Sequence, residues 1–94
     1  MCGIFGIAST RYIKNKLYQG LSKLEYRGYD SAGISGHGPS EKLLTIKATG
    51  PIRNLKNKLS KLSTITSGIA HTRWATHGEP TLKNTHPHLS DKLC

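Results

Sequence analysis

Hydrophobic residues recur at two different periods along the chain, and each period predicts a kind of element. The short apolar run at 2–8 predicts a strand buried on both faces, and its glycines indicate close approaches of the backbone. Over 11–24 and again over 52–62, apolar residues return every three or four positions, which is typical of a helix with one buried side. These two stripes are Ile13, Leu17, Leu21 and Leu24, followed by Ile52, Leu55, Leu59 and Leu62.

Turn and cap residues separate these elements. Ser9 or Thr10 is expected to cap the first helix, and Pro51 suits the first turn of the second. Two further runs predict strands at 32–36 and 43–48, and the run at 66–72 predicts another short buried strand. The order strand, helix, two strands, helix, strand predicts an α+β layered fold in one small domain, since the chain has 94 residues.

The pattern stops after position 72. Residues 73–88 contain Gly78, Pro80 and Pro87 among polar side chains, without a sustained apolar period. A long segment of this kind is usually functional or disordered.

Charge and composition narrow the function only a little. The chain carries 14 Lys and Arg against 5 Asp and Glu, a formal charge of +9 that favours phosphates, anionic surfaces or acidic partners. Aromatic residues do not interleave with the basic ones, so the pattern does not indicate a base-stacking platform. We expect no nucleic-acid partner, and a small basic nucleic-acid-binding protein is kept as an alternative.

The two cysteines, Cys2 and Cys94, stand at opposite ends of the sequence, which is unlike the disulfide framework of a small secreted domain. The first residues lack the pattern of a signal peptide, and no apolar run is long enough to cross a bilayer. We expect a cytoplasmic protein that has no membrane partner.

Cys2 is the first candidate for chemistry. Removal of Met1 would leave a cysteine with a free α-amino group, whose ordinary pKa is about 7.7–8.0, beside a thiol of ordinary pKa about 8.5. The amine can then act as the base for the thiol, as in enzymes with an N-terminal nucleophile. Gly3 would let a substrate carbonyl approach the backbone. The alternative is that Cys2 is a small buried hydrophobic residue of the strand.

The segment that follows the last predicted strand is the second candidate. Arg73 presents a planar fork suited to a carboxylate, and Trp74 offers a rigid surface that could close over a small ligand. Thr76 and His77 follow in a loop whose backbone groups can point at that ligand. The alternative is a surface cation beside a core tryptophan.

Four histidines, at positions 71, 77, 86 and 88, raise the question of a metal site. Their spacing does not match the usual close pairs of zinc ligands, and no internal cysteine joins them. We therefore expect neither a metal nor a cofactor. His86 and His88 flank Pro87 and alternate as on an extended segment, so ordinary loop histidines account for them.

Four segments together carry a resemblance to a known family. MCGIFGI, LEYRGYDSAGI, GIAHTRWATHGEPT and NTHPH are similar to class II glutamine amidotransferases, and within that class to the hexosamine-forming glutamine–fructose-6-phosphate aminotransferases. The resemblance covers nearly the whole chain. Another class II enzyme, such as an amidophosphoribosyltransferase, is the nearest alternative, and the surroundings of Tyr29 and Trp74 argue against it.

The resemblance implies a fold and a reaction. Residues 2–94 would be the N-terminal portion of the glutaminase domain, an incomplete four-layer αββα sandwich of the N-terminal-nucleophile hydrolase fold. Cys2 would attack the side-chain amide of L-glutamine, and Arg73 would hold the substrate carboxylate. Arg27 would order the site around the N-terminus. The loop with Trp74, Thr76 and His77 would close over the substrate.

In the family, ammonia then passes to a second domain that aminates fructose 6-phosphate, and the full proteins form homo-oligomers. The family pattern continues beyond the matched residues with an oxyanion-hole Asn-Gly pair and an Asp for the substrate amine. Because losing one oxyanion donor alone lowers a rate by about 10²–10³, we expect the 94 residues by themselves to have no appreciable glutaminase activity.

Overall fold

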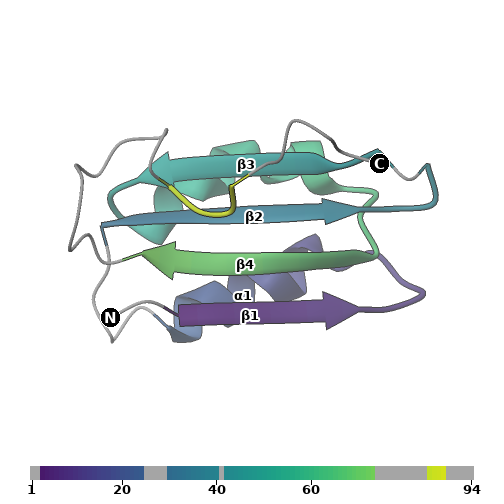
Figure 1. Cartoon of the computed structure of the whole chain (residues 1–94), viewed down its shortest axis with the longest axis horizontal. Helices are drawn as coiled ribbons and strands as arrows, with labels where there is room; N and C mark the ends of the chain where they lie inside the picture. The colour runs from purple at the N-terminus through teal and green to yellow at the C-terminus, as the bar shows by residue number, and fades with distance from the viewer. Residues whose placement is uncertain (1–2, 25–29, 41, 74–84, 89–94) are drawn as a thin grey trace.

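The computed structural model describes residues 3–24, 30–40, 42–73 and 85–88, and shows one four-stranded sheet with two helices (Figure 1). In chain order the elements are β1 (Gly3–Ala8), α1 (Lys14–Lys23), β2 (Ser31–His37), β3 (Leu44–Thr49), η2 (Ile52–Leu62) and β4 (Ser67–Arg73). The element order predicted from the hydrophobic periods is therefore confirmed, as is the α+β class.

The sheet has the strand order β1-β4-β2-β3, and each pair of neighbouring strands is antiparallel. β4, the last strand in the chain, therefore lies between the first and second strands. Its residue Thr72 is opposite Gly3 of β1 on one side and Ala32 of β2 on the other. This arrangement places Gly3, the first described residue, in the strand beside the one that Arg73 ends.

Both helices cover the same face of the sheet, and Figure 1 shows them behind it. The predicted stripes face inward: Ile13, Leu17 and Leu21 are at most 1% exposed, and Leu55 and Leu62 are fully buried. Every second strand residue completes this core, because side chains alternate between the two faces of a strand. These strand residues are Ala32, Ile34, Ile46, Ala48 and Ala70.

The opposite face of the sheet, which we call the open face, carries no helix among the described residues (Figure 1). Ile4 and Ile69 point to it and are 71% and 49% exposed. The prediction that the strand at 2–8 is buried on both faces was therefore wrong for 3–8. β1 is an edge strand with cover on one side, and the same open face makes the strand at 66–72 only half buried.

The helix ends differ from their predictions. α1 begins at Lys14 with Ile13 in the cap position, and no side chain caps it; Ser9 instead accepts a hydrogen bond from the backbone of Arg11, 3.1 Å away. The second helix, η2, is a 3₁₀-helix rather than an α-helix, and Pro51 occupies its cap position instead of its first turn. Neither described helix combines the length and the apolar character that crossing a membrane would require.

Candidate functional site

The pairing of β1 with β4 holds Gly3 against Thr72, the residue before Arg73. The backbone N–H of Gly3 donates a hydrogen bond to Oγ1 of Thr72, 3.1 Å away, and this contact is buried. A side chain at position 3 would have no room, since a Cβ there would lie 2.9 Å from Cδ1 of Leu24. Gly3, the residue after Cys2, is thus anchored by the side chain of Thr72, the residue before Arg73.

Arg73 ends β4 on the open face, opposite Ser31 of β2. Its side chain is half-buried, and its backbone oxygen accepts a hydrogen bond of 2.8 Å from the backbone N–H of Asp30. Ser31 is fully buried, and its Oγ has no hydrogen-bond partner among the described residues. Arg73 therefore stands at the end of β4, paired across the strands with a residue whose hydroxyl is buried.

The segment Thr85–His88, which we call the strap, lies across the open face. Gly33 of β2 makes this possible, because a Cβ at that position would overlap the carbonyl oxygen of His86 and come within 2.8 Å of Cδ of Pro87. Thr85 is fully buried, and Pro87 is buried too. The strap is thus packed onto the sheet by its backbone and by its own side chains.

The strap brings three imidazoles together. The ring centroids of His71 and His86 are 4.4 Å apart, and those of His86 and His88 are 4.3 Å apart. Burial lowers the pKa of His71, and the neighbouring His86, His88 and Arg73 lower it further. Burial also lowers the pKa of His86, followed by the charges of His88, Arg73 and Lys47. His71 and His86 are therefore held towards their neutral forms.

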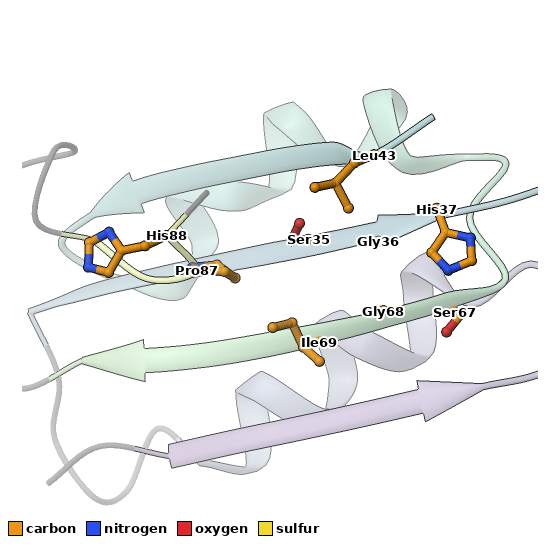
Figure 2. Close-up of a pocket in the computed structure, with 9 residues that line it drawn as sticks. All are labelled: Ser35, Gly36, His37, Leu43, Ser67, Gly68, Ile69, Pro87 and His88. Carbon is orange, nitrogen blue, oxygen red and sulfur yellow. The ribbon is translucent and has the colours of Figure 1, made fainter. Parts of the chain in front are cut away.

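Beside the strap the open face is hollowed. The hollow has a volume of about 330 Å³ and runs between β2 and β4 (Figure 2). Figure 2 shows His88 and Pro87 at one end of it and His37 at the other, with Leu43 and Ile69 along its sides. Its lining is largely apolar, so an apolar side chain or ligand part suits it better than an ion.

Comparison with known proteins decides the family. The chain is 51% identical over 90 residues to the glutamine–fructose-6-phosphate aminotransferase [isomerizing] of Lactococcus lactis, which covers 96% of this chain. It is 47% identical to the protein of the same name from Francisella tularensis, in a match that covers 100% of this chain. It is 48% identical to the one from Legionella pneumophila, in a match that covers 96% of this chain. This chain belongs to the glutamine–fructose-6-phosphate aminotransferase family.

The match covers only a part of each aminotransferase. The chain spans 15% of the Lactococcus lactis and Legionella pneumophila proteins and 16% of the Francisella tularensis protein. No family model matches the chain. The relatives' names describe enzymes that act with glutamine and fructose 6-phosphate.

Of the site residues predicted from the sequence, the structure describes Gly3 and Arg73. They belong to neighbouring strands, and the Gly3–Thr72 hydrogen bond joins these strands beside Arg73. The described contacts give a packing reason for glycine at position 3, and its contact with a substrate stays a prediction. Five further predicted residues lie outside the described ranges: Cys2, Arg27, Trp74, Thr76 and His77.

Sequence reasoning missed Thr72 and the imidazole cluster. The alternation along β4 carried a signal for Thr72, because it places this polar residue on the same buried face as Ala70. His86 and His88 lie in a loop, as expected, but the extended alternation predicted for them is not observed, since residues 85–87 bend and the two ring centroids are 4.3 Å apart. Among the residues that the structure describes, no three His, Cys, Asp or Glu side chains are arranged to hold a metal ion.

Proposed function

We propose that this chain supplies the nucleophile and the carboxylate-binding arginine of a glutamine-hydrolysing site. The observation that carries the proposal is the pairing of Gly3 with Thr72. Cys2 directly precedes Gly3 in the sequence, and Arg73 directly follows Thr72. The nucleophile then directly precedes β1 in the sequence, and the anion-binding arginine ends the neighbouring strand β4. Rigid elements hold a reacting constellation more accurately than free loops do.

The reaction begins at the thiol of Cys2 after Met1 is removed. The α-amine takes the thiol proton, the sulfur attacks the side-chain amide carbon of glutamine, and the C–N bond breaks as the proton passes to the leaving ammonia. Water then hydrolyses the thioester, which releases glutamate and restores the thiol. No metal or cofactor takes part in these steps.

Arg73 holds the α-carboxylate of glutamine through its two-pronged guanidinium. Trp74, Thr76 and His77 close over the substrate and exclude water from the thioester, and Arg27 orders the N-terminus. The open face of the sheet packs against a second sheet, which completes the αββα sandwich. In the intact aminotransferase, the ammonia is used to aminate fructose 6-phosphate, and the enzyme is a homo-oligomer.

The proposal can be tested by supplying the rest of the domain separately. The chain, purified without Met1, would be mixed with the remainder of the Lactococcus lactis aminotransferase, and glutamate release from L-glutamine would be measured. We expect hydrolysis from the mixture and none from either part alone. Cys2→Ala should abolish it, whereas Cys94→Ser should leave it unchanged. Equal hydrolysis by the Cys2→Ala mixture would refute the assignment of the nucleophile.

The role of Arg73 needs a separate variant. Arg73→Lys keeps the positive charge but loses the two-pronged geometry, so the KM for glutamine should rise by at least about tenfold while kcat changes less. A variant that lowers kcat at an unchanged KM would argue against carboxylate binding at this residue.

A further inference from the structure

The three imidazoles of the cluster come from two separate parts of the chain. His71 belongs to β4, in the middle of the sheet, whereas His86 and His88 belong to the strap. The ring contacts at 4.4 and 4.3 Å are therefore contacts between the strap and the sheet and within the strap itself. Any change in the charge of these rings acts directly on how the strap is held.

The described surroundings of the cluster are basic. β4 contributes Arg73 next to His71, and β3 contributes Lys47 near His86. The strands on either side of His71 place Gly33 and Ile4 opposite it, and these carry no charge. Nδ1 of His71 is buried and has no hydrogen-bond partner in the part of the chain that the structure describes. Within the described part of the chain, every charge that acts on His71 or His86 thus opposes protonation.

We propose that the contact between His71 of β4 and His86 of the strap is a pH-sensitive latch, which holds the strap across Gly33 while these two imidazoles are neutral and releases it when they are protonated. Two imidazolium rings whose centroids are about 4.4 Å apart repel each other, and the repulsion is strong where water is partly excluded. Release separates His71 from His86 and exposes both rings to water, so it removes their mutual repulsion and the desolvation of their charged forms.

The direction of the pH effect follows from proton binding. In the docked state the pKa of His71 and the pKa of His86 lie below the ordinary histidine value, whereas in the released state they return towards it. The released state therefore binds more protons. Docking is complete above the ordinary histidine pKa of about 6.5 and weakens as the pH falls below it. For each proton taken up on release, the docking equilibrium changes by up to about tenfold per pH unit.

The latch can be tested by NMR on the complete, isotopically labelled chain between pH 8 and pH 5. The backbone signals of Gly33 and Thr85 report docking, the imidazole signals report protonation, and the signals of Ile46 and Ala48 report the integrity of the sheet. We expect the signals of Gly33 and Thr85 to shift with the titration midpoint of His71 and His86, which should lie below the ordinary histidine value. Ile46 and Ala48 should stay unchanged over the same range.

Three variants separate the latch from a general effect of acid. His71→Phe keeps an aromatic ring against the strap but removes its charge, so the midpoint for Gly33 and Thr85 should move to lower pH. His86→Gln removes the central ring and should leave Thr85 largely released even at pH 8. His37→Gln is the matched control, because His37 lies on the same face but outside the ring contacts, and it should behave like the unmodified chain.

Several outcomes would overturn the proposal. Constant Gly33 and Thr85 signals from pH 8 to pH 5 would show that the strap does not respond to protonation. Loss of the Ile46 and Ala48 signals at the same midpoint would show that the sheet unfolds as a whole. A chain without dispersed sheet signals at pH 8, or a His71→Phe variant with an unchanged midpoint, would equally contradict it.

Discussion

The backbone N–H of Gly3 and the hydroxyl of Thr72 are 69 positions apart in the chain and are joined by a buried hydrogen bond of 3.1 Å. This contact lies at the end of the β1–β4 pair, where Gly3 and Thr72 are opposite each other. Because β1 is an edge strand, the pairing with β4 is its only strand contact among the described residues. The hydrogen bond therefore secures the point at which the chain enters the sheet.

Replacing Thr72 by Val should destabilise the chain. Valine fills nearly the same volume, but it leaves the N–H of Gly3 buried without an acceptor, which costs about 1–3 kcal/mol of unfolding free energy. Thr72→Ser retains the hydroxyl, so it should keep most of the unfolding free energy that the hydrogen bond contributes. Urea denaturation of the three proteins would check this, and equal midpoints for Val and Thr would show that the hydrogen bond contributes nothing.

Gly33→Ala should displace the strap. A Cβ at this position overlaps the carbonyl oxygen of His86, and because this atom belongs to the backbone it cannot turn aside as a side chain can. Overpacking of this kind costs about 1–3 kcal/mol, and here the strap rather than the sheet should move. The NMR signals of Thr85 and His86 should therefore change strongly, while those of Ile46 stay in place.

Gly6→Ala provides the control for this substitution. Gly6 also lies on the open face of the sheet. A Cβ there would lie 3.7 Å from both the backbone oxygen of Gly68 and Cγ2 of Ile69, which is ordinary van der Waals contact. This variant should leave the strap signals unchanged. If both alanine variants shifted Thr85 equally, the close approach of the strap to Gly33 would be wrong.

The two faces of the sheet should respond differently to truncation. Ile34 is fully buried beneath the helices, so Ile34→Ala should cost about 2–5 kcal/mol, because it removes contacts and leaves a cavity. Ile4 is 71% exposed on the open face, and Ile4→Ala should change stability by no more than about 0.5 kcal/mol. Chemical denaturation would compare them, and a large loss for Ile4→Ala would mean that the open face is covered in solution.

The hydrophobic periods predicted the local elements well but could not predict which face of the sheet is covered. Leu17, Leu21 and Leu55 were assigned to buried helix faces because the helical period is a local property of the chain, and all three are buried. The prediction for β1 failed because a short apolar run looks the same in a central strand and in an edge strand. Strand order depends on contacts between distant segments, which leave no period in the sequence.

The candidate site was predictable to a similar extent. The chemistry of Arg73 was visible in its side chain, and the resemblance to the aminotransferases assigned it a role. Its proximity to Gly3 depends on β4 entering the sheet between β1 and β2, which no local pattern predicts. The contact between His71 and His86 depends in turn on the strap crossing Gly33, so it could be found only after the fold was known.

The charges around the imidazole cluster lead to a prediction that separates two neighbours. Arg73 lowers the pKa of both His71 and His86, whereas Lys47 acts on His86. Replacing Arg73 by Gln removes a positive charge that opposes protonation, so the pKa of both imidazoles should rise. Lys47→Gln should raise the pKa of His86 and leave that of His71 nearly unchanged. The same reasoning predicts that a carboxylate bound to Arg73 raises both values, and that the strap is then released at a higher pH. Imidazole NMR titrations of the two variants would check the first step, with His37 as an internal reference. Equal shifts of His71 in both variants would contradict the arrangement, because they would mean that Lys47 approaches His71 as closely as Arg73 does.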